Sequence, residues 1–181
     1  MGEKMRIVHD SVAEGRRNVV SWKQMEAINM ENHAERAARL FREGCNCAQS
    51  VFLAYSDLTG MDRDTAIRVS ASFGGGMGRL REVCGGVSGA IMALGMICAP
   101  LDPADQDAKA EHYRRVQAVA AKFREKHGTI ICRDLLGDKA GTGHVPEART
   151  EQYYKSRPCE RMVYDGAAAL EEVLKELGYK I

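Results

Sequence analysis

The chain has 181 residues, of which 45 % are apolar and 28 % charged, with 26 Lys and Arg against 25 Asp and Glu. This length and composition suit one globular domain with a sizeable core. A formal net charge of +1 lacks the basic excess of a non-specific nucleic-acid binder, and 6 % aromatic residues argue against a base-stacking surface. We therefore expect no nucleic-acid partner.

The first 25 residues are expected to form an N-terminal arm ahead of a helical domain over residues 26–181. Charged residues interrupt the start of the chain every few positions, so it lacks the apolar core of a signal peptide. The longest apolar run, residues 83–100, is shorter than the ~20 residues of a spanning helix and is interrupted by glycines. We therefore expect a cytoplasmic protein with no membrane partner.

Apolar residues in the first half of the chain recur at helical spacing. The repeat that begins at Ala34 stops at Gly44, a typical residue after a helix end. Asn46 and Asp62 stand immediately before apolar repeats and are expected to be N-caps. The helices predicted here cover residues 34–41, 46–55 and 62–73.

The second half also has helical periodicity and shows no convincing alternation of period two. Asp102 is expected to be an N-cap with Pro103 in the first turn, and Gly128 to end that helix. Tyr113 and Phe123 are expected to face the core. The helices predicted here cover residues 83–99, 102–127, 130–137 and 158–177, with a polar loop over 137–149. The predicted fold class is all-α, a single-domain helical bundle in which the apolar helix 83–99 is buried on all sides.

Four of the six cysteines lie where a predicted helix begins: Cys47, Cys84, Cys132 and Cys159. Free N–H groups and the positive dipole end at a helix start stabilise a thiolate, the form that attacks disulfides and binds metals. In a cytoplasmic chain with an ample core, such cysteines are more often redox groups or metal ligands than structural disulfides. The chain has no C-x-x-C pair, so a shared site must be assembled by the tertiary fold.

The other cysteines and the histidines carry weaker signals. Cys98 lies inside the apolar helix and is expected to be a small core residue. Cys45 forms C-x-C with Cys47, and a supporting redox or ligand role for it stays open. The histidines have no metal-binding spacing; His112 and His127 are expected on a solvated helix face, and His144 in a loop is not expected to be a ligand.

Five short segments occur in a distinctive order. They are Gly44-x-x-Cys47-Ala48-Gln49, Phe73–Arg79, Glu82–Ala90, Cys132-Arg133-x-Leu135-Leu136-Gly137 and Cys159. Together they resemble the C_GCAxxG_C_C family of redox-active proteins over roughly residues 30–178. Gly86 stands where the family motif has alanine, and we expect this difference of one methyl group not to disturb the chemistry.

The resemblance extends to the cysteine-bearing region of the split-Soret cytochromes c. It implies an iron–sulfur cluster held by Cys47, Cys84, Cys132 and Cys159, of either the 2Fe-2S or the 4Fe-4S type. Those cytochromes also bind haem, but this chain has no C-x-x-C-H, so covalent haem attachment is excluded.

The glycine run over residues 74–78 precedes Cys84, and three roles are considered for it. Backbone N–H groups of this run are expected to shield or tune a cluster, with Gly76 and Gly85 as cofactor-binding residues. An anion-binding nest formed with Arg79 and Arg81 is the less favoured reading, beside a tight connection between two helices. Gly85, Gly86 and Gly89 are expected to allow close approach of a neighbouring helix.

The leading hypothesis is a redox protein whose four cysteines bind an iron–sulfur cluster and transfer electrons to an unidentified redox partner. A metal-free dithiol/disulfide protein is the second hypothesis, and a structural zinc module is the third. Whether the protein is an enzyme, such as an oxidoreductase, or an electron carrier stays open. A homodimer is plausible from the alanine-rich helix faces.

Overall fold

The computed structural model describes residues 31–181, so the expected arm over residues 1–25 lies outside the described residues. This range is helical and contains no β-strand, which confirms the predicted all-α class. The elements, in chain order, are α2 (His33–Arg42), α3 (Cys47–Ala54), α4 (Ser56–Thr59), α5 (Arg63–Ser70), η1 (Ala71–Phe73), α6 (Gly74–Met77), α7 (Gly85–Cys98), α8 (Gln106–His127), α9 (Cys132–Leu136), η2 (Gly137–Lys139), α10 (Glu151–Ser156) and α11 (Cys159–Glu176).

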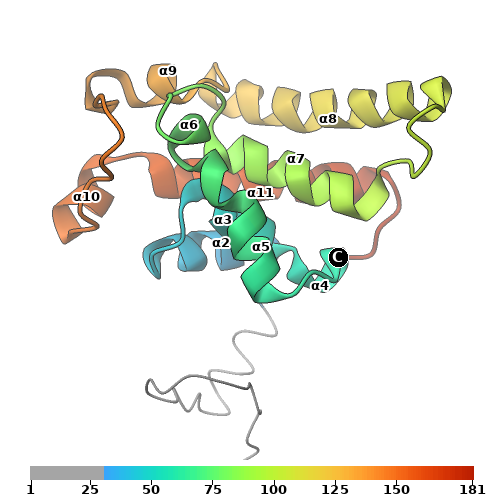
Figure 1. The fold of residues 1–181 in the computed structure, drawn as a ribbon, viewed down its shortest axis with the longest axis horizontal. Helices are drawn as coiled ribbons and strands as arrows, with labels where there is room; N and C mark the ends of the chain where they lie inside the picture. Colours follow the sequence, from blue (N-terminus) through green and yellow to red (C-terminus); the bar gives the residue numbers. More distant parts are fainter. Residues whose placement is uncertain (1–30) are drawn as a thin grey trace, which may run out of the picture. The chain divides into compact units, whose positions relative to one another are not determined.

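Helix α7 runs through the middle of the bundle (Figure 1). It packs against α3, α8 and α11, and α2 in turn packs against α3 and α11. The short elements α6, α9 and α10 lie at the end of the bundle where α7 and α11 begin (Figure 1). This end therefore gathers several helix starts, which are the positions of the four predicted site cysteines.

The N-caps predicted from the sequence at Asn46 and Asp62 are both present. The side chain of Asn46 accepts hydrogen bonds from the backbone N–H groups of Ala48 and Gln49, both at 3.0 Å. The side chain of Asp62 accepts one from the N–H of Thr65 at 3.0 Å. Each side chain satisfies donors that a helix start leaves without a partner, and this fixes where the helix begins.

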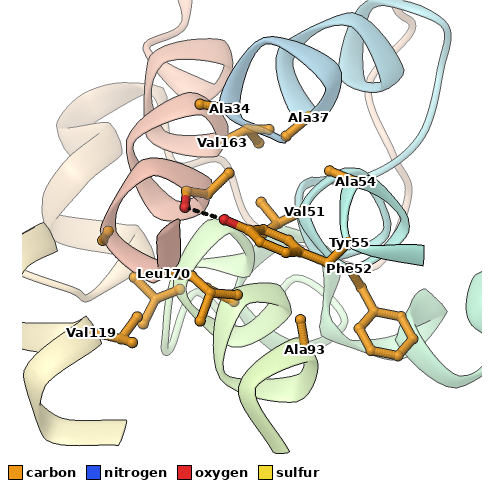
Figure 2. Packing of buried hydrophobic residues seen from close by; sticks show 14 of the residues in the cluster. Ala34, Ala37, Val51, Phe52, Ala54, Tyr55, Ala93, Val119, Val163 and Leu170 are labelled. Carbon is orange, nitrogen blue, oxygen red and sulfur yellow. Dashed lines mark hydrogen bonds between the residues drawn. The ribbon is translucent and has the colours of Figure 1, made fainter. Parts of the chain in front are cut away.

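The core lies where α2, α3, α7 and α11 meet (Figure 2). Tyr55 has no exposed surface, and its hydroxyl donates a hydrogen bond to the carbonyl of Ala167 in α11 at 2.7 Å. His33 stacks on the Tyr55 ring at 4.3 Å between centroids, and its Nε2 lies 3.1 Å from Oδ2 of Asp57. The polar groups of this interior are thus paired, as buried groups in a stable core normally are.

Glycines let the central helix approach its neighbours closely. A Cβ at Gly86 would lie 2.6 Å from the carbonyl oxygen of Met162 in α11, and one at Gly89 would lie 2.5 Å from that of Ala48 in α3. Real Cβ atoms essentially never approach a backbone oxygen so closely, so the expected close helix approach is confirmed. An alanine at Gly86 would have no room for its methyl group in this packing, while the expectation that glycine at this motif position leaves the chemistry undisturbed stays a prediction.

Helix α7 is not buried on all sides, contrary to the prediction. Val87, Ala90 and Leu94 are fully buried, whereas Ser88 and Ile91 are only partly buried and Met96 near the end is exposed. The glycines near the start of α7 bring two helices onto its buried face. No helix of residues 31–181 is long and apolar enough to span a bilayer.

Helix α8 begins later than predicted. Its N-cap is Asp105, which accepts from the N–H of Ala108 at 2.9 Å, whereas Asp102 accepts from Ala104 in a preceding turn at 2.8 Å. Tyr113 is exposed rather than inward, and the inward face carries Phe123 together with Val119. The helix ends at Gly128, as predicted.

His127 is partly buried, with a side chain 10 % exposed, contrary to the expectation of a solvated position. Its Nε2 lies 3.0 Å from Oδ2 of Asp165, and Nε of Arg161 lies 2.5 Å from the same oxygen. Asp165 is 1 % exposed and lies on the helix face that packs against α8. An acidic residue in an otherwise apolar stripe pulls the histidine inward as its partner, a pairing that helical periodicity alone does not reveal.

Candidate functional site

The four cysteines at the helix starts border one cavity of about 260 Å³. Cys84 is the least exposed of them at 4 %, followed by Cys132 at 7 % and Cys159 at 9 %, whereas Cys47 is partly exposed. All six cysteines of the chain are free thiols. The tertiary fold therefore brings together the residues that the sequence analysis singled out.

A short backbone pairing sets Cys84 beside Cys132. Val83 and Ile131 form an isolated antiparallel bridge. Next to it, the N–H of Cys84 donates to the carbonyl of Ile130 at 2.8 Å, and the N–H of Cys132 donates to that of Glu82 at 2.6 Å. The starts of α7 and α9 are thereby tied to each other, although 47 residues separate the two cysteines in the sequence.

Cys47 is held by the cap of its own helix. The Nδ2 group of Asn46 donates to the carbonyl of Ala71 at 2.9 Å. This bond ties the start of α3 to the segment before the glycine run over residues 74–78, here called the glycine loop. A Cβ at Gly85 would lie 2.7 Å from the Cβ of Cys47. The missing side chain at Gly85 thus lets the start of α7 pack directly on Cys47.

Cys159 begins α11, whose contact with α7 also depends on missing side chains. A Cβ at Gly166 would lie 2.5 Å from the carbonyl oxygen of Gly86. This close packing brings the starts of α7 and α11, and so Cys84 and Cys159, to the same end of the bundle (Figure 1).

The glycine loop closes one side of the cavity. Gly76 has a φ of +69°, and a Cβ there would lie 2.7 Å from the Cβ of Cys132. Gly76 and Gly85 both border the cavity. Their expected part in binding a cofactor stays a prediction, while their immediate effect is to leave room for Cys132 and Cys47.

The pKa values of Cys159 and Cys47 are shifted in opposite directions. Hydrogen bonding with the Cys47 thiol lowers the pKa of Cys159 to about 7, assisted by the positive charges of Arg157 and Arg149 and opposed by burial. The pKa of Cys47 is raised well above its usual value by the same hydrogen bond and by burial. Cys159 is therefore the nucleophilic member of this pair in the metal-free protein.

Burial raises the pKa of Cys84 to about 12, although the N–H groups of Gly86 and Val87 act in the opposite direction. Burial also raises the pKa of Cys132, against the lowering effect of Arg81. The expectation that a helix start favours the thiolate is thus wrong for Cys47, Cys84 and Cys132. The hydrogen bond with Cys159 and burial raise the pKa of Cys47, and desolvation outweighs the backbone donors at Cys84 and the effect of Arg81 at Cys132. The donors that lower the pKa of Cys84 come from α7 itself and not from the glycine loop.

Cys45 and Cys98 do not border the cavity. Cys98 is the last residue of α7, partly exposed, and its Sγ lies 3.3 Å from the carbonyl oxygen of Leu94. It packs at the margin of the core and is less buried than expected. Burial raises the pKa of Cys45, so this thiol is a weak nucleophile beside Cys159.

Four arginines border the same cavity: Arg79, Arg81, Arg149 and Arg157. Arg79 and Arg81 follow the glycine run in the sequence, whereas the sequence alone assigned no role to the other two. Arg149 and Arg157 flank α10, a helix that was not predicted, and no motif links them to the cysteines. Their charges lower the pKa of Cys159, so they belong to the site's electrostatics.

The described residues contain no preformed site for a single metal ion. Within residues 31–181, no group of three or more His, Cys, Asp or Glu side chains is arranged to hold one ion. His144 borders the cavity, but it is exposed.

The fold and the site together define an all-α domain in which cysteines from four separate helix starts border one cavity. A family model described as "Putative redox-active protein (C_GCAxxG_C_C)" matches residues 45–173. The chain belongs to this family, and the resemblance seen in the sequence is confirmed. No curated protein and no protein of solved structure matches the chain.

Proposed function

We propose that Cys47, Cys84, Cys132 and Cys159 hold an iron–sulfur cluster and that the protein transfers electrons. When bound, such a cluster takes up and releases electrons at a potential set by its surroundings. The observation that carries this proposal is the convergence of the four helix-start cysteines on one cavity. Family membership supports the coarser statement that the protein is redox-active.

The donor set suits a cluster better than a single ion. A cluster takes its thiolates from several directions around a bulky inorganic core, whereas one zinc ion requires all ligands within bonding distance of one point. Cys159 influences the pKa of Cys47, Cys84 and Cys132, so the four sulfurs lie in one electrostatic neighbourhood. The cavity of about 260 Å³ supplies the space between them.

The surrounding residues suit a negatively charged thiolate site. Burial makes the Cys84 thiolate unfavourable in the metal-free protein, so its ionisation requires compensating charge such as iron supplies. The N–H groups of Gly86 and Val87 favour the ionised sulfur, and such hydrogen bonds tune a cluster's potential. Arg81 acts in the same direction on Cys132.

The test is metal analysis of protein purified without oxygen. Iron, zinc and acid-labile sulfide are quantified per chain, and the absorption spectrum is recorded before and after reconstitution with iron and sulfide. We expect iron and sulfide in matching amounts, with visible absorption that bleaches on reduction. A colourless, iron-free product after reconstitution would overturn the proposal.

A second candidate function rests on the opposite pKa shifts of Cys159 and Cys47. A low-pKa nucleophile beside a buried thiol is the arrangement used in dithiol exchange. In this alternative, the Cys159 thiolate attacks a disulfide of a partner protein and Cys47 resolves the mixed disulfide. The products are a Cys47–Cys159 disulfide and two partner thiols. Mass mapping after mild oxidation tests it, since a reversible Cys47–Cys159 link supports exchange and its absence contradicts it.

A further inference from the structure

The cavity beside the cysteines is strongly basic although the chain is nearly neutral. Four arginines border it together with one carboxylate, that of Glu147. Glu147 pairs with Nη2 of Arg157 at 2.5 and 2.6 Å and lies 3.7 Å from Nη1 of Arg79. Among residues 31–181, the only carboxylate of the lining is thus shared by two arginines, and neither Arg81 nor Arg149 has an acidic partner there.

Arg81 carries a buried donor that has no acceptor. The residue is 8 % exposed, and its Nε donates to the carbonyl of Gly141 at 3.3 Å. Its Nη2 is buried and has no hydrogen-bond partner within the described part of the chain. A buried guanidinium nitrogen of this kind costs free energy until an acceptor reaches it.

Arg149 repeats this feature from another element. Its guanidinium carbon lies 4.3 Å from the centroid of the Phe41 ring, and its Nη2 donates to the carbonyl of Cys45 at 3.3 Å. Its Nη1 is buried and likewise has no partner among residues 31–181. The stacking fixes the guanidinium in place, so one donor of a rigid group is left free beside the cysteines.

We infer that the cavity binds a small tetrahedral oxyanion, such as phosphate or sulfate, through the guanidinium groups of Arg81 and Arg149, which both border it. Guanidinium donors match the oxygens of such anions in geometry and charge. A water molecule has roughly 30 Å³ of liquid volume, so a cavity of about 260 Å³ has room for the anion.

The backbone of the loop that carries Arg81 supports a binding role. Arg79 and Arg81 have backbone φ angles of +70° and +62°, which residues other than glycine rarely adopt. Such strain concentrates at ligand-binding segments. The inference goes beyond the proposed function because it concerns the metal-free protein and requires no cluster.

The test uses the full chain, reduced and metal-free, in a buffer without phosphate or sulfate. Inorganic phosphate is titrated by calorimetry against chloride of equal ionic strength, and iodoacetamide labelling of each cysteine is followed by peptide mapping. We expect saturable phosphate binding and slower labelling of Cys159, with labelling of Cys98 unchanged. Phosphate and chloride having the same effect would overturn the inference.

Substitutions of the two arginines test whether the anion binds beside them. Arg81→Gln and Arg149→Gln are each expected to weaken phosphate binding by about tenfold or more, because each removes a charge-assisted donor. Arg114→Gln is the matched control, since Arg114 is exposed on α8 and pairs with Glu111. Circular dichroism confirms folding of each variant, and binding of undiminished strength in both cavity variants would contradict the inference.

The outcome is separate from that of the proposed function. If the two arginines serve only to balance a cluster's charge, the protein will load iron and the metal-free form will not bind phosphate; this result overturns the anion site alone. Phosphate binding in a protein that never takes up iron supports the anion site and overturns the cluster.

Discussion

Two buried polar regions of this bundle differ in whether their groups find partners. Around Tyr55, the hydroxyl bonds to Ala167 and the stacked His33 lies between the carboxylates of Asp57 and Glu171. Around the cysteines, four thiols are free, and Arg81 and Arg149 each leave a buried nitrogen without an acceptor among residues 31–181. The polar groups of the first region are paired within the described fold, whereas those of the second are the groups that the proposed cluster or anion would engage.

Removal of one cavity cysteine should have the largest effect. Cys84→Ser is expected to reduce iron content to background after reconstitution, because Cys84 is the most buried of the four thiols and the one with backbone donors from the start of α7. Metal analysis of the purified variant checks this. Cys98→Ser, outside the cavity, should keep its iron, and full iron loading of Cys84→Ser would mean that the cavity is not the cluster site.

The acidity of Cys159 should separate it from the other cavity thiols. Below its pKa of about 7 the group is a thiol, so in metal-free protein its alkylation rate should rise about tenfold per pH unit up to pH 7 and then level off. Cys84, with a pKa raised to about 12, should react far more slowly at pH 8. Peptide mapping after timed labelling measures both rates.

The pH dependence of Cys159 alkylation can be checked by removing the hydrogen-bond partner of Cys159. Cys47→Ala removes the hydrogen bond that lowers the pKa of Cys159, so the midpoint should move upward. An unchanged midpoint would show that the two sulfurs do not interact. Cys84 labelling faster than Cys159 would contradict the assignment of Cys84 to the protected interior.

The tight contact of α7 with α11 should tolerate no added methyl group. Gly86→Ala is expected to lower the free energy of unfolding by about 1–3 kcal/mol through overpacking, because its Cβ would meet the Met162 carbonyl at 2.6 Å. Gly95→Ala, on the same helix with open space around it, should instead raise stability by about 0.5–1 kcal/mol. Chemical denaturation measures both, and equal effects would refute the close contact.

The smallest effect is expected in the satisfied core. Tyr55→Phe removes the hydroxyl bonded to Ala167 and should lower the free energy of unfolding by about 1 kcal/mol. Tyr113→Phe, on an exposed tyrosine, should leave stability unchanged. Neither variant should alter cysteine labelling, and a changed Cys159 rate in Tyr55→Phe would mean that the two polar regions are not independent.

Much of the fold follows from local signals in the sequence. The caps at Asn46 and Asp62, the stop at Gly128 and the apolar stripe of the last helix each depend on residues within a few positions. Local signals also mislead, since Asp102 and Asp105 are both plausible caps and only the turn around Ala104 decides between them. Helix α10 was missed because its six residues carry too short a pattern.

In the candidate site too, some residues follow from local sequence signals and others depend on the tertiary fold. The four cysteines could be selected because a helix start is a local property and because the family motif surrounds them. Arg149 could not, since its place at the site depends on a contact with the Cys45 carbonyl, 104 residues away in the sequence. Arg157 lies two residues before Cys159 and could have been selected from the sequence as a neighbouring charge. The raised pKa values of Cys84 and Cys132 were missed for a related reason, because burial is a tertiary property.

The central claim is that the four cavity cysteines hold one cluster, and native mass spectrometry of anaerobically purified protein tests it most directly. We expect the folded chain to carry the added mass of one iron–sulfur cluster, which is lost on denaturation and absent from Cys84→Ser. A folded chain at its bare mass, or lighter by the hydrogens of a disulfide, after reconstitution with iron and sulfide would contradict the claim.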